Sequence, residues 1–265
     1  MRSMGRLGTL GELATRDTPA ARLDARVKVL ATLAYVAVVA SFGRHELLRL
    51  APLATFPIAL AALGDVPLRA LVRPLLLASP FALGVAAFEP FLDRTPVPLG
   101  GVAVSAGVLA FATILAKFVL SLSAALLLVA TTGFDQVCVA LRHLGAPRAL
   151  VAQLLLTHRY LFVLSAETSR SLRAHALRAP GRSRPTLRVA GTMLGALLVR
   201  AMARAERVHT AMRCRGFGGD LPLVRRARPG RADAIFAAAT AALLVVARVQ
   251  DVPALFGAVL PGGPG

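Results

Sequence analysis

The chain has 265 residues, of which 56% are hydrophobic and 17% charged, and its mean hydropathy is +0.67. Soluble domains carry about a quarter charged residues, so this composition favours an integral membrane protein over a soluble one. The net charge is +18, and all but two of the 31 basic residues are arginines. The two cysteines, Cys138 and Cys214, are too few for a disulfide framework or a zinc site built on cysteines.

The N-terminal segment, residues 1–26, is polar and basic. It contains five arginines but no apolar run of signal-peptide length, so no cleavable signal is expected. Positive charge beside a membrane helix marks the cytoplasmic side of the membrane. This segment is therefore predicted to be cytoplasmic.

Four apolar segments follow within residues 27–130, each near the ~20 residues that a helix needs to cross a bilayer. They lie at 27–42, about 47–63, about 68–88 and about 105–130. Prolines that kink or interrupt helices occur in the second and third segments: Pro52, Pro57, Pro74 and Pro80. Lys117 lies inside the fourth, where a lysine that faces the bundle interior or reaches the interface is favoured over an ion pathway. Residues 27–130 are thus predicted to form transmembrane helices 1–4.

The next region, residues 131–231, holds most of the positive charge. From residue 134 onward it contains 18 arginines against four acidic residues. Four spans return the chain to the cytoplasm, so this region is predicted to be cytoplasmic. A fifth span is predicted at 232–249, followed by an external tail at 250–265. The predicted fold class is an all-α, polytopic membrane protein with about five transmembrane helices and a cytoplasmic region of long amphipathic helices.

Two long amphipathic helices are predicted in the basic region. The first begins at Pro147 and runs to about residue 178, with an apolar stripe of Leu150, Leu154, Leu161, Ser165, Thr168 and Leu172. The second runs over about 186–215 and ends at Gly216, since a glycine commonly follows a helix at the C′ position. Its apolar stripe contains Leu194, Leu197, Ala201, Ala205, Val208 and Met212, and a different face carries Arg200, Arg204 and Arg207. Each helix ends in arginines beside a chain breaker.

Catalytic motifs are missing from the sequence. A phosphate-binding P-loop needs lysine followed by serine or threonine, but the only two lysines precede Val29 and Phe118. The five histidines show no ligand spacing, and HELLR at 45–49 lacks the second histidine of a zinc-protease helix. The sequence therefore predicts a non-catalytic chain that holds no cofactor and no metal.

Three functions compete for helices that end in arginines. Nucleic-acid binding is disfavoured, because the basic helices have almost no aromatic residues for stacking. Attachment of basic helices to a lipid membrane is the second. Docking onto another protein is the third, since an arginine at a helix end offers a rigid, bidentate, permanently charged group that suits a carboxylate-lined groove.

Three segments of the chain carry a family resemblance. They are LDARVKVLATLAYVAVVAS at 23–41, TTGFDQVCVALRHLGAPRALVAQLLLTHRYLFVLSAETSRSLRAHALR at 131–178 and RAMARAERVHTAMRCRGFGG at 200–219. In combination they resemble the T component, or transmembrane coupling subunit, of energy-coupling factor (ECF) transporters. The third segment and the Arg-Tyr-Leu-Phe-Val stretch look most like the cobalt/nickel group, the CbiQ type.

The resemblance implies a scaffold in the cell inner membrane, which spans it several times. T components join a substrate-binding membrane subunit (S component), in some cases with a small accessory membrane subunit, to two cytoplasmic ATP-binding subunits. The chain would then couple ATP hydrolysis by these partners to uptake of a transition-metal ion, with cobalt favoured. A nickel or vitamin-uptake T component stays open, as does a membrane-anchored interaction protein without a transport role.

The resemblance also implies two docking motifs of the Ala-Arg-Gly type, one at the end of each long helix. Each motif of the family inserts into a groove on one ATPase. The second motif is intact in this sequence, whereas the first keeps its spacing but continues as Ala-Pro-Gly. The predicted ATPase-docking residues are Arg173, Arg178, Ala211, Arg213, Arg215 and Gly216.

Overall fold

The structure is a computed structural model that describes residues 18–44, 46–92, 96–99, 102–178, 185–219 and 230–249. The chain divides into two compact units, and each is described by itself. We call the unit formed by Thr9–Val137 and Ala227–Gly265 the bundle. We call the unit formed by Met1–Gly8 and Cys138–Arg226 the arm.

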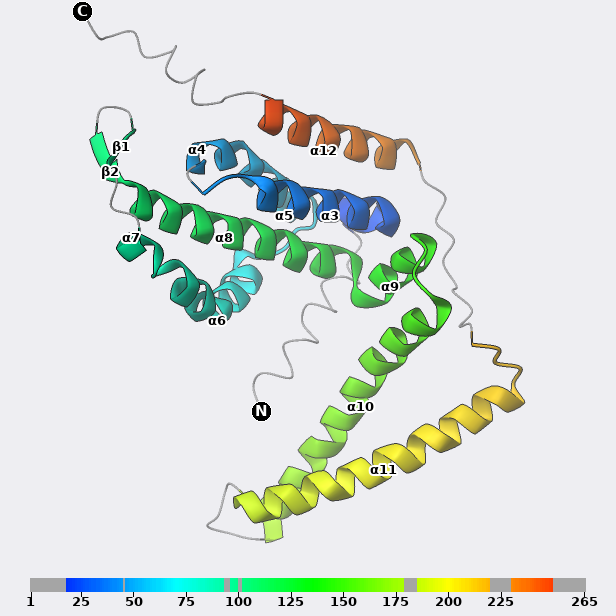
Figure 1. Ribbon diagram of the computed structural model, residues 1–265. Coiled ribbons are helices and arrows are strands. Elements are labelled where there is room, and N and C mark those ends of the chain that lie inside the picture. Colours follow the sequence, from blue (N-terminus) through cyan, green and yellow to red (C-terminus); the bar gives the residue numbers. More distant parts are fainter. Residues whose placement is uncertain are drawn as a thin grey trace, which may run out of the picture. The chain divides into compact units, whose positions relative to one another are not determined.

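The bundle consists of helices and one short hairpin. Its helices are α2 (Pro19–Arg22), α3 (Ala25–Ser41), α4 (Leu47–Leu50), the 3-10 helix η1 (Ala51–Ala54), α5 (Thr55–Leu63), α6 (Leu68–Ala86), α7 (Glu89–Leu92), α8 (Ala106–Thr132) and α12 (Arg231–Val249). The hairpin, which was not predicted from the sequence, pairs β1 (Pro96–Leu99) antiparallel with β2 (Val102–Ser105). The central helix is α8, which packs against α3, α5, α6 and α7 (Figure 1).

The core of the bundle gathers around Tyr35. This side chain is fully buried, its hydroxyl donates a hydrogen bond to the carbonyl oxygen of Leu53 at 3.0 Å, and its ring stacks on Phe56 with centroids 4.5 Å apart. From α8, Leu120 and Leu127 close the same cluster. This hydrogen bond satisfies the hydroxyl group of the tyrosine. The ring can therefore pack in the apolar core without leaving a buried polar group unpaired.

Prolines act differently in the two segments that contain them. The predicted second span is divided into α4, η1 and α5, with Pro52 at the start of the 3-10 turn and Pro57 in the first turn of α5. A first-turn proline costs little, because its missing N–H would be unpaired there anyway. By contrast, α6 continues through Pro74 and Pro80 without a break. The first, fourth and fifth predicted spans correspond to α3, α8 and α12.

Four of the described helices are long and apolar enough to cross a membrane: α6 from Arg69, α8, α12 and α10 (Arg148–Arg178). Three of them were predicted as spans, whereas α10 belongs to the region predicted to be cytoplasmic. With 17 residues, α3 rises about 26 Å, slightly less than the ~30 Å hydrocarbon core. The prediction of an all-α, multi-pass membrane protein is confirmed, and the division of the chain into spans and cytoplasmic regions stays a prediction.

Polar contacts fix the directions of three helices in the bundle. Near the start of α3, Lys28 donates from Nζ to the carbonyl oxygen of Thr131, near the end of α8, at 3.2 Å. The backbone N–H of Asp24, just before α3, donates to Asp233 at the start of α12. Thus α3 and α12 both begin where α8 ends. The predicted first, fourth and fifth spans require this arrangement.

The second lysine of the chain also faces the interior of the bundle. From α8, Lys117 donates from Nζ to the carbonyl oxygen of Phe42 at 2.6 Å. Phe42 is the C-cap residue of α3, whose last carbonyl groups have no partner within the helix. Lys117 therefore completes the end of α3, in agreement with the structural role favoured from the sequence.

The arm consists of α9 (Phe134–His143), which contains the boundary between the units, followed by α10 and α11 (Leu187–Cys214). At the end of α9, Gly145 has φ +100° and the N–H of Ala146 donates to the carbonyl oxygen of Leu141 at 3.0 Å. This turn is the Schellman motif that ends many helices. With 31 and 28 residues, α10 and α11 are about 46 and 42 Å long. Both match the predicted helices.

Candidate functional site

The end of α11 has the geometry predicted from its sequence. Gly216 has φ +80°, the left-handed conformation that favours glycine. The N–H of Gly216 donates to the carbonyl oxygen of Arg213, and the N–H of Phe217 to that of Met212, both at 3.0 Å. These two bonds form a Schellman motif, which satisfies the last carbonyl groups and stops the helix. Arg215 is the C-cap residue and is exposed, so its side chain starts from the helix end.

All six predicted docking residues are exposed. Arg178 is the last residue of α10, and Arg173 lies somewhat more than one turn earlier. Cations near a helix C-terminus are favoured by the helix dipole, which places negative partial charge there. The Ala-Pro-Gly sequence that follows Arg178 lies outside the described residues. Each helix end therefore presents arginines to solvent.

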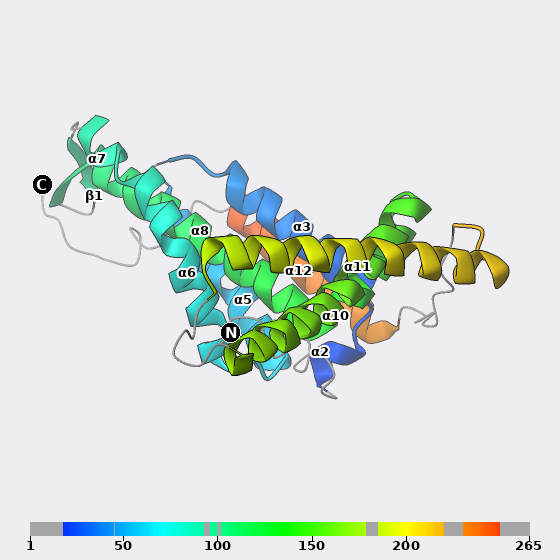
Figure 2. The same ribbon diagram turned by 90° about the horizontal axis from the view of Figure 1, so that it is seen from below.

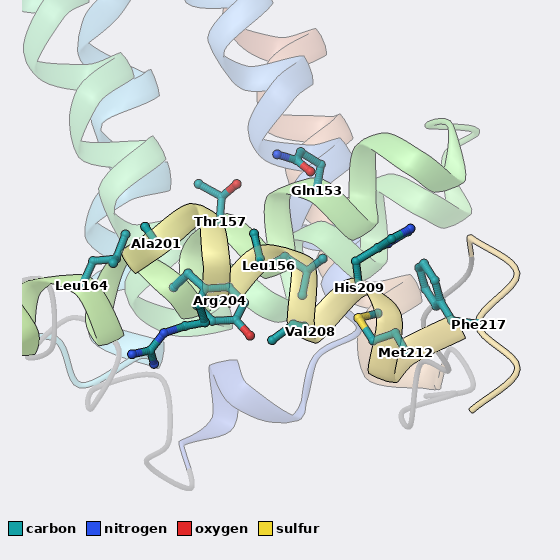
Figure 3. Close-up of a pocket in the computed structure, with 12 residues that line it drawn as sticks. Gln153, Leu156, Thr157, Leu164, Ala201, Arg204, Val208, His209, Met212 and Phe217 are labelled. Carbon is teal, nitrogen blue, oxygen red and sulfur yellow. The ribbon is translucent and has the colours of Figure 1, made fainter. Parts of the chain in front are cut away.

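In the arm, α10 and α11 contact each other and run in opposite directions along the chain (Figure 1 and Figure 2). The first half of α10 and the second half of α11 line a crevice of about 330 Å³ (Figure 3). Its side chains are Gln153, Leu156, Thr157, Tyr160, Leu164, Ala201, Arg204, Ala205, Val208, His209, Met212 and Phe217. A second crevice, of about 190 Å³, lies between the end of α10 and the start of α11. The helix ends with Arg178 and Arg215 are therefore at opposite ends of the pair, separated by roughly the ~42 Å length of α11.

Between the two crevices, Glu167 of α10 forms ion pairs with two arginines of α11. Its Oε1 lies 3.2 Å from Nε of Arg200, and its Oε2 lies 3.3 Å from a terminal nitrogen of Arg204. The Glu167 side chain is 13% exposed, whereas the two arginines are 54% and 39% exposed. The prediction that Arg200 and Arg204 lie on a separate face was wrong: both reach toward α10, and Arg204 lines the larger crevice. Exposed ion pairs of this kind stabilise only weakly, so Glu167 orients the helices more than it stabilises them.

The predicted apolar stripe of α11 faces α10, and that of α10 is correct in part. Every residue of the α11 stripe lines one of the two crevices. On α10, Thr168 and Leu172 line the smaller crevice, but Leu150 and Leu161 are 49% and 45% exposed. The face that α10 turns toward α11 instead includes three polar side chains: Gln153, Thr157 and Tyr160. Because only apolar residues were used to predict the contact face of α10, the predicted face was rotated away from the one that packs beside α11.

The first half of α11 carries apolar side chains that no described residue of the arm buries. None of the 28 residues of α11 is buried. Leu187 is 92% exposed and Val199 is 68% exposed, and a Cβ added at Gly195 would meet no atom within 4 Å. Single exposed apolar residues are ordinary, but a helix face of this length is suited to packing against a further surface.

The described residues hold no group of three histidine, cysteine, aspartate or glutamate side chains that fits a metal ion. His45, the first residue of HELLR, lies outside the described residues. The described surface of the arm offers arginine guanidinium groups and apolar side chains. Such a surface is suited to binding a macromolecule.

The fold and the arm place the chain in a class of proteins: multi-pass, all-α membrane proteins with two long helices that end in exposed arginines. The family of cobalt transport proteins named CbiQ matches residues 16–224, and the chain belongs to this family. The match extends from just before α2 to beyond α11, so it includes both arginine-bearing ends. A comparison with curated protein sequences finds no match.

Sequence reasoning missed two residues of the arm. Glu167 entered only as one of four acidic charges, although it is the one acidic residue of α10 and its neighbours in the structure are two arginines. Phe217, after the helix stop, lines the crevice with Met212. A hydrophobic contact between these two positions commonly accompanies the Schellman motif, so the Gly-Phe pair was an available signal.

Proposed function

We propose that the chain is the T component of an ECF-type transporter, the membrane scaffold that couples ATP hydrolysis on partner subunits to cobalt uptake. The observation that carries this proposal is the arm: two antiparallel helices with exposed arginines at opposite ends, in a chain of a cobalt transport family. Two separate ends suit two ATP-binding subunits, one at each end.

The proposed docking contact is an arginine from each helix end in a groove on an ATPase. Arg215 follows the last helical residue, and Gly216 stops the chain there, so a groove can enclose the guanidinium without meeting the side of the helix. A carboxylate in the groove would form a bidentate pair with it. Movement of the ATPases would then displace α10 and α11 as rigid bodies, since helices tilt more easily than they bend.

The exposed apolar face of α11 suits a second membrane partner. The S component that captures the ion, with or without a small accessory membrane subunit, is the partner that we propose for this face. Ion selectivity would then lie in that subunit. A nickel or vitamin-uptake T component remains the alternative within the class, and copurified subunits tested for cobalt against nickel uptake would distinguish them.

The test of docking is Arg215→Ala in the chain coexpressed with its ATP-binding and S subunits. Removing one partner of a desolvated charge pair typically costs ~2–5 kcal/mol, so ATPase copurification should fall steeply and uptake should be lost. Arg178→Ala should have the same effect in milder form, because two docking points share the load and the motif of Arg178 is irregular. The isolated chain should show no ATP hydrolysis above background.

Arg207→Ala is the matched control, because Arg207 is exposed on the same helix but not at its end. It should leave copurification and uptake unchanged. If Arg207→Ala releases the ATPases while Arg215→Ala retains them, the basic side of α11 and not its end forms the contact. If neither ATPase copurifies with the wild-type chain, the alternative of an interaction protein without a transport role replaces the proposal.

We also propose that the arm is cytoplasmic and that the C-terminal tail is external. Although α10 is long and apolar enough to span a membrane, it carries Arg159, Glu167 and Arg170, and a charge at the centre of a span costs ~2.5–3.5 kcal/mol. In a background of Cys138→Ala and Cys214→Ser, a membrane-impermeant thiol reagent should label Gly263→Cys in intact cells. It should label Ala174→Cys only after lysis, and labelling of Ala174→Cys in intact cells would show that α10 spans the membrane.

A further inference from the structure

Three charged residues are buried where α3, α8 and α12 meet, and docking of the arm uses none of them. Asp24 and Asp233 are each 6% exposed, and Lys28 is 1% exposed. We call these three residues the buried charge cluster. Burial of a charge is costly unless the charge is paired and hydrogen-bonded, so such a cluster needs an explanation.

Lys28 joins α3 to two other segments of the bundle. Its Nζ donates hydrogen bonds to the carbonyl oxygen of Ala20 in α2, at 2.9 Å, and to that of Thr131 in α8, at 3.2 Å. The carboxylates of Asp233 and Asp24 attract its positive charge. The ammonium group therefore offsets one of the two negative charges in the cluster, and it also binds the end of α8.

Asp233 joins α12 to the start of α3. One carboxylate oxygen accepts from the N–H of Gly230 at 2.7 Å, which satisfies a free donor at the start of α12. The other accepts from the N–H of Asp24 at 2.6 Å, across 209 residues of sequence. Asp24 in turn caps α3 by accepting from the N–H of Arg26 at 2.9 Å. Its second oxygen is buried and accepts no hydrogen bond within the described part of the chain.

The cluster lies at the point where the chain leaves the bundle. Thr131 belongs to the last turn of α8, and Gly133, with φ +79°, separates α8 from α9. A second constraint acts on the same turn, since a Cβ on Gly64 would overlap Cγ2 of Thr131. The end of α8 is thus held from two sides directly before the arm begins.

We propose that Lys28 is a positioning residue for coupling: it bonds the end of α8 to α3, which the bond between Asp24 and Asp233 joins to α12, so that displacement of the arm moves the whole bundle. Without the bond from Lys28 to Thr131, the end of α8 would move by itself. The displacement of the arm would then not reach the rest of the bundle. The inference rests on the proposed function of the chain as a coupling subunit. It assigns a role in transport to a side chain that contacts neither the ATPases nor the ion.

The test is Lys28→Met in the complex with the ATP-binding and S subunits. Hydrogen exchange should rise about tenfold or more at the amides of Asp24 and Gly230, which report the cluster directly. Uptake of Co²⁺ per ATP hydrolysed in proteoliposomes should fall about tenfold, while ATPase copurification is retained. The matched control is Lys117→Met, the same substitution at the only other lysine, which should leave exchange at both amides unchanged.

Two results would overturn the inference: unchanged exchange at both amides, or faster exchange with unchanged uptake per ATP. If Lys28→Met does not assemble, Lys28→Met/Asp24→Asn removes one uncompensated carboxylate and keeps a good N-cap. This double variant should assemble and still transport little per ATP, and its failure to assemble would reduce Lys28 to a purely structural role. Failure of wild-type copurification would reject the proposed function instead, while exchange in the isolated chain would still test the cluster.

Discussion

The bundle and the arm are both built from long helices, yet they differ in how much side-chain surface they bury. In the bundle, α8 buries 12 of its 27 residues, whereas in the arm α11 buries none of its 28. Helices that cross a membrane are held together by close packing and by hydrogen bonds between them, so the bundle is stabilised by its own side chains. Within the arm, apolar and cationic side chains of α11 stay exposed. The stability of the fold and its proposed docking function thus lie in different parts of the chain.

The exposed apolar residues of the two regions also differ in what can cover them. In the bundle, Leu77 and Phe81 of α6 are 85% and 79% exposed, and lipid covers such side chains on a helix that crosses a membrane. In the arm, Leu187 and Leu198 stand on a helix with arginines on its other faces. A protein surface suits this mixture of apolar and cationic groups better than a hydrocarbon core does.

The largest expected difference comes from the same substitution made in both regions. Leu127 is 1% exposed in the core of the bundle, and Leu127→Ala should lower the free energy of unfolding by about 2–5 kcal/mol. Leu198 is 61% exposed in the arm, and Leu198→Ala should change it by less than about 0.5 kcal/mol. Unfolding of the purified chain in detergent measures both. Equal losses would show that the arm is stabilised by burial after all.

Glycine-to-alanine substitutions should have opposite effects on stability in the bundle and in the arm. At Gly64 a Cβ would overlap Cγ2 of Thr131, a rigid β-branched side chain, so Gly64→Ala should destabilise by about 1–3 kcal/mol. At Gly195 a Cβ meets open space within a helix, so Gly195→Ala should stabilise α11 by up to ~1 kcal/mol. Thermal unfolding of the bundle and hydrogen exchange in α11 are the measurements. A destabilising Gly195→Ala would reveal a close contact at that face.

The smallest expected effect concerns the stop of α11. Because Gly216 has φ +80°, Gly216→Ala should cost about 1 kcal/mol and loosen the last turn, measured as faster exchange of the Phe217 amide. Gly218 has open space and no left-handed φ, so Gly218→Ala should leave that exchange unchanged. Similar effects at both glycines would contradict the Schellman geometry as the cause of the stop.

Local signals predicted the arm more accurately than the contacts within it. The ends of α10 and α11 fall within one or two residues of the predicted positions, since Pro147 and Gly216 act through their own backbone geometry. The face of α10 was wrong in its first half, because Gln153, Thr157 and Tyr160 pack beside α11 as polar residues. Apolar periodicity cannot detect a helix face built from polar side chains.

In the bundle, the effect of each proline on its helix also could not be predicted from local sequence. Sequence alone could not distinguish the break at Pro52 from the continuous helix through Pro74 and Pro80, because neighbouring helices decide whether freed carbonyl groups are satisfied. The hairpin of β1 and β2 was missed because its two strands have four residues each, too short for a clear alternation.

By itself the sequence determined the class of protein, the two long helices of the arm and the exposed arginines at their ends. Those properties follow from composition, apolar periodicity and chain-breaking residues, which act over a few neighbouring positions. The tertiary structure alone decided that Lys28 binds Thr131, 103 residues away, and that Asp24 binds Asp233, 209 residues away. Such partners depend on which helix ends the packed core brings together, and no local pattern encodes that choice.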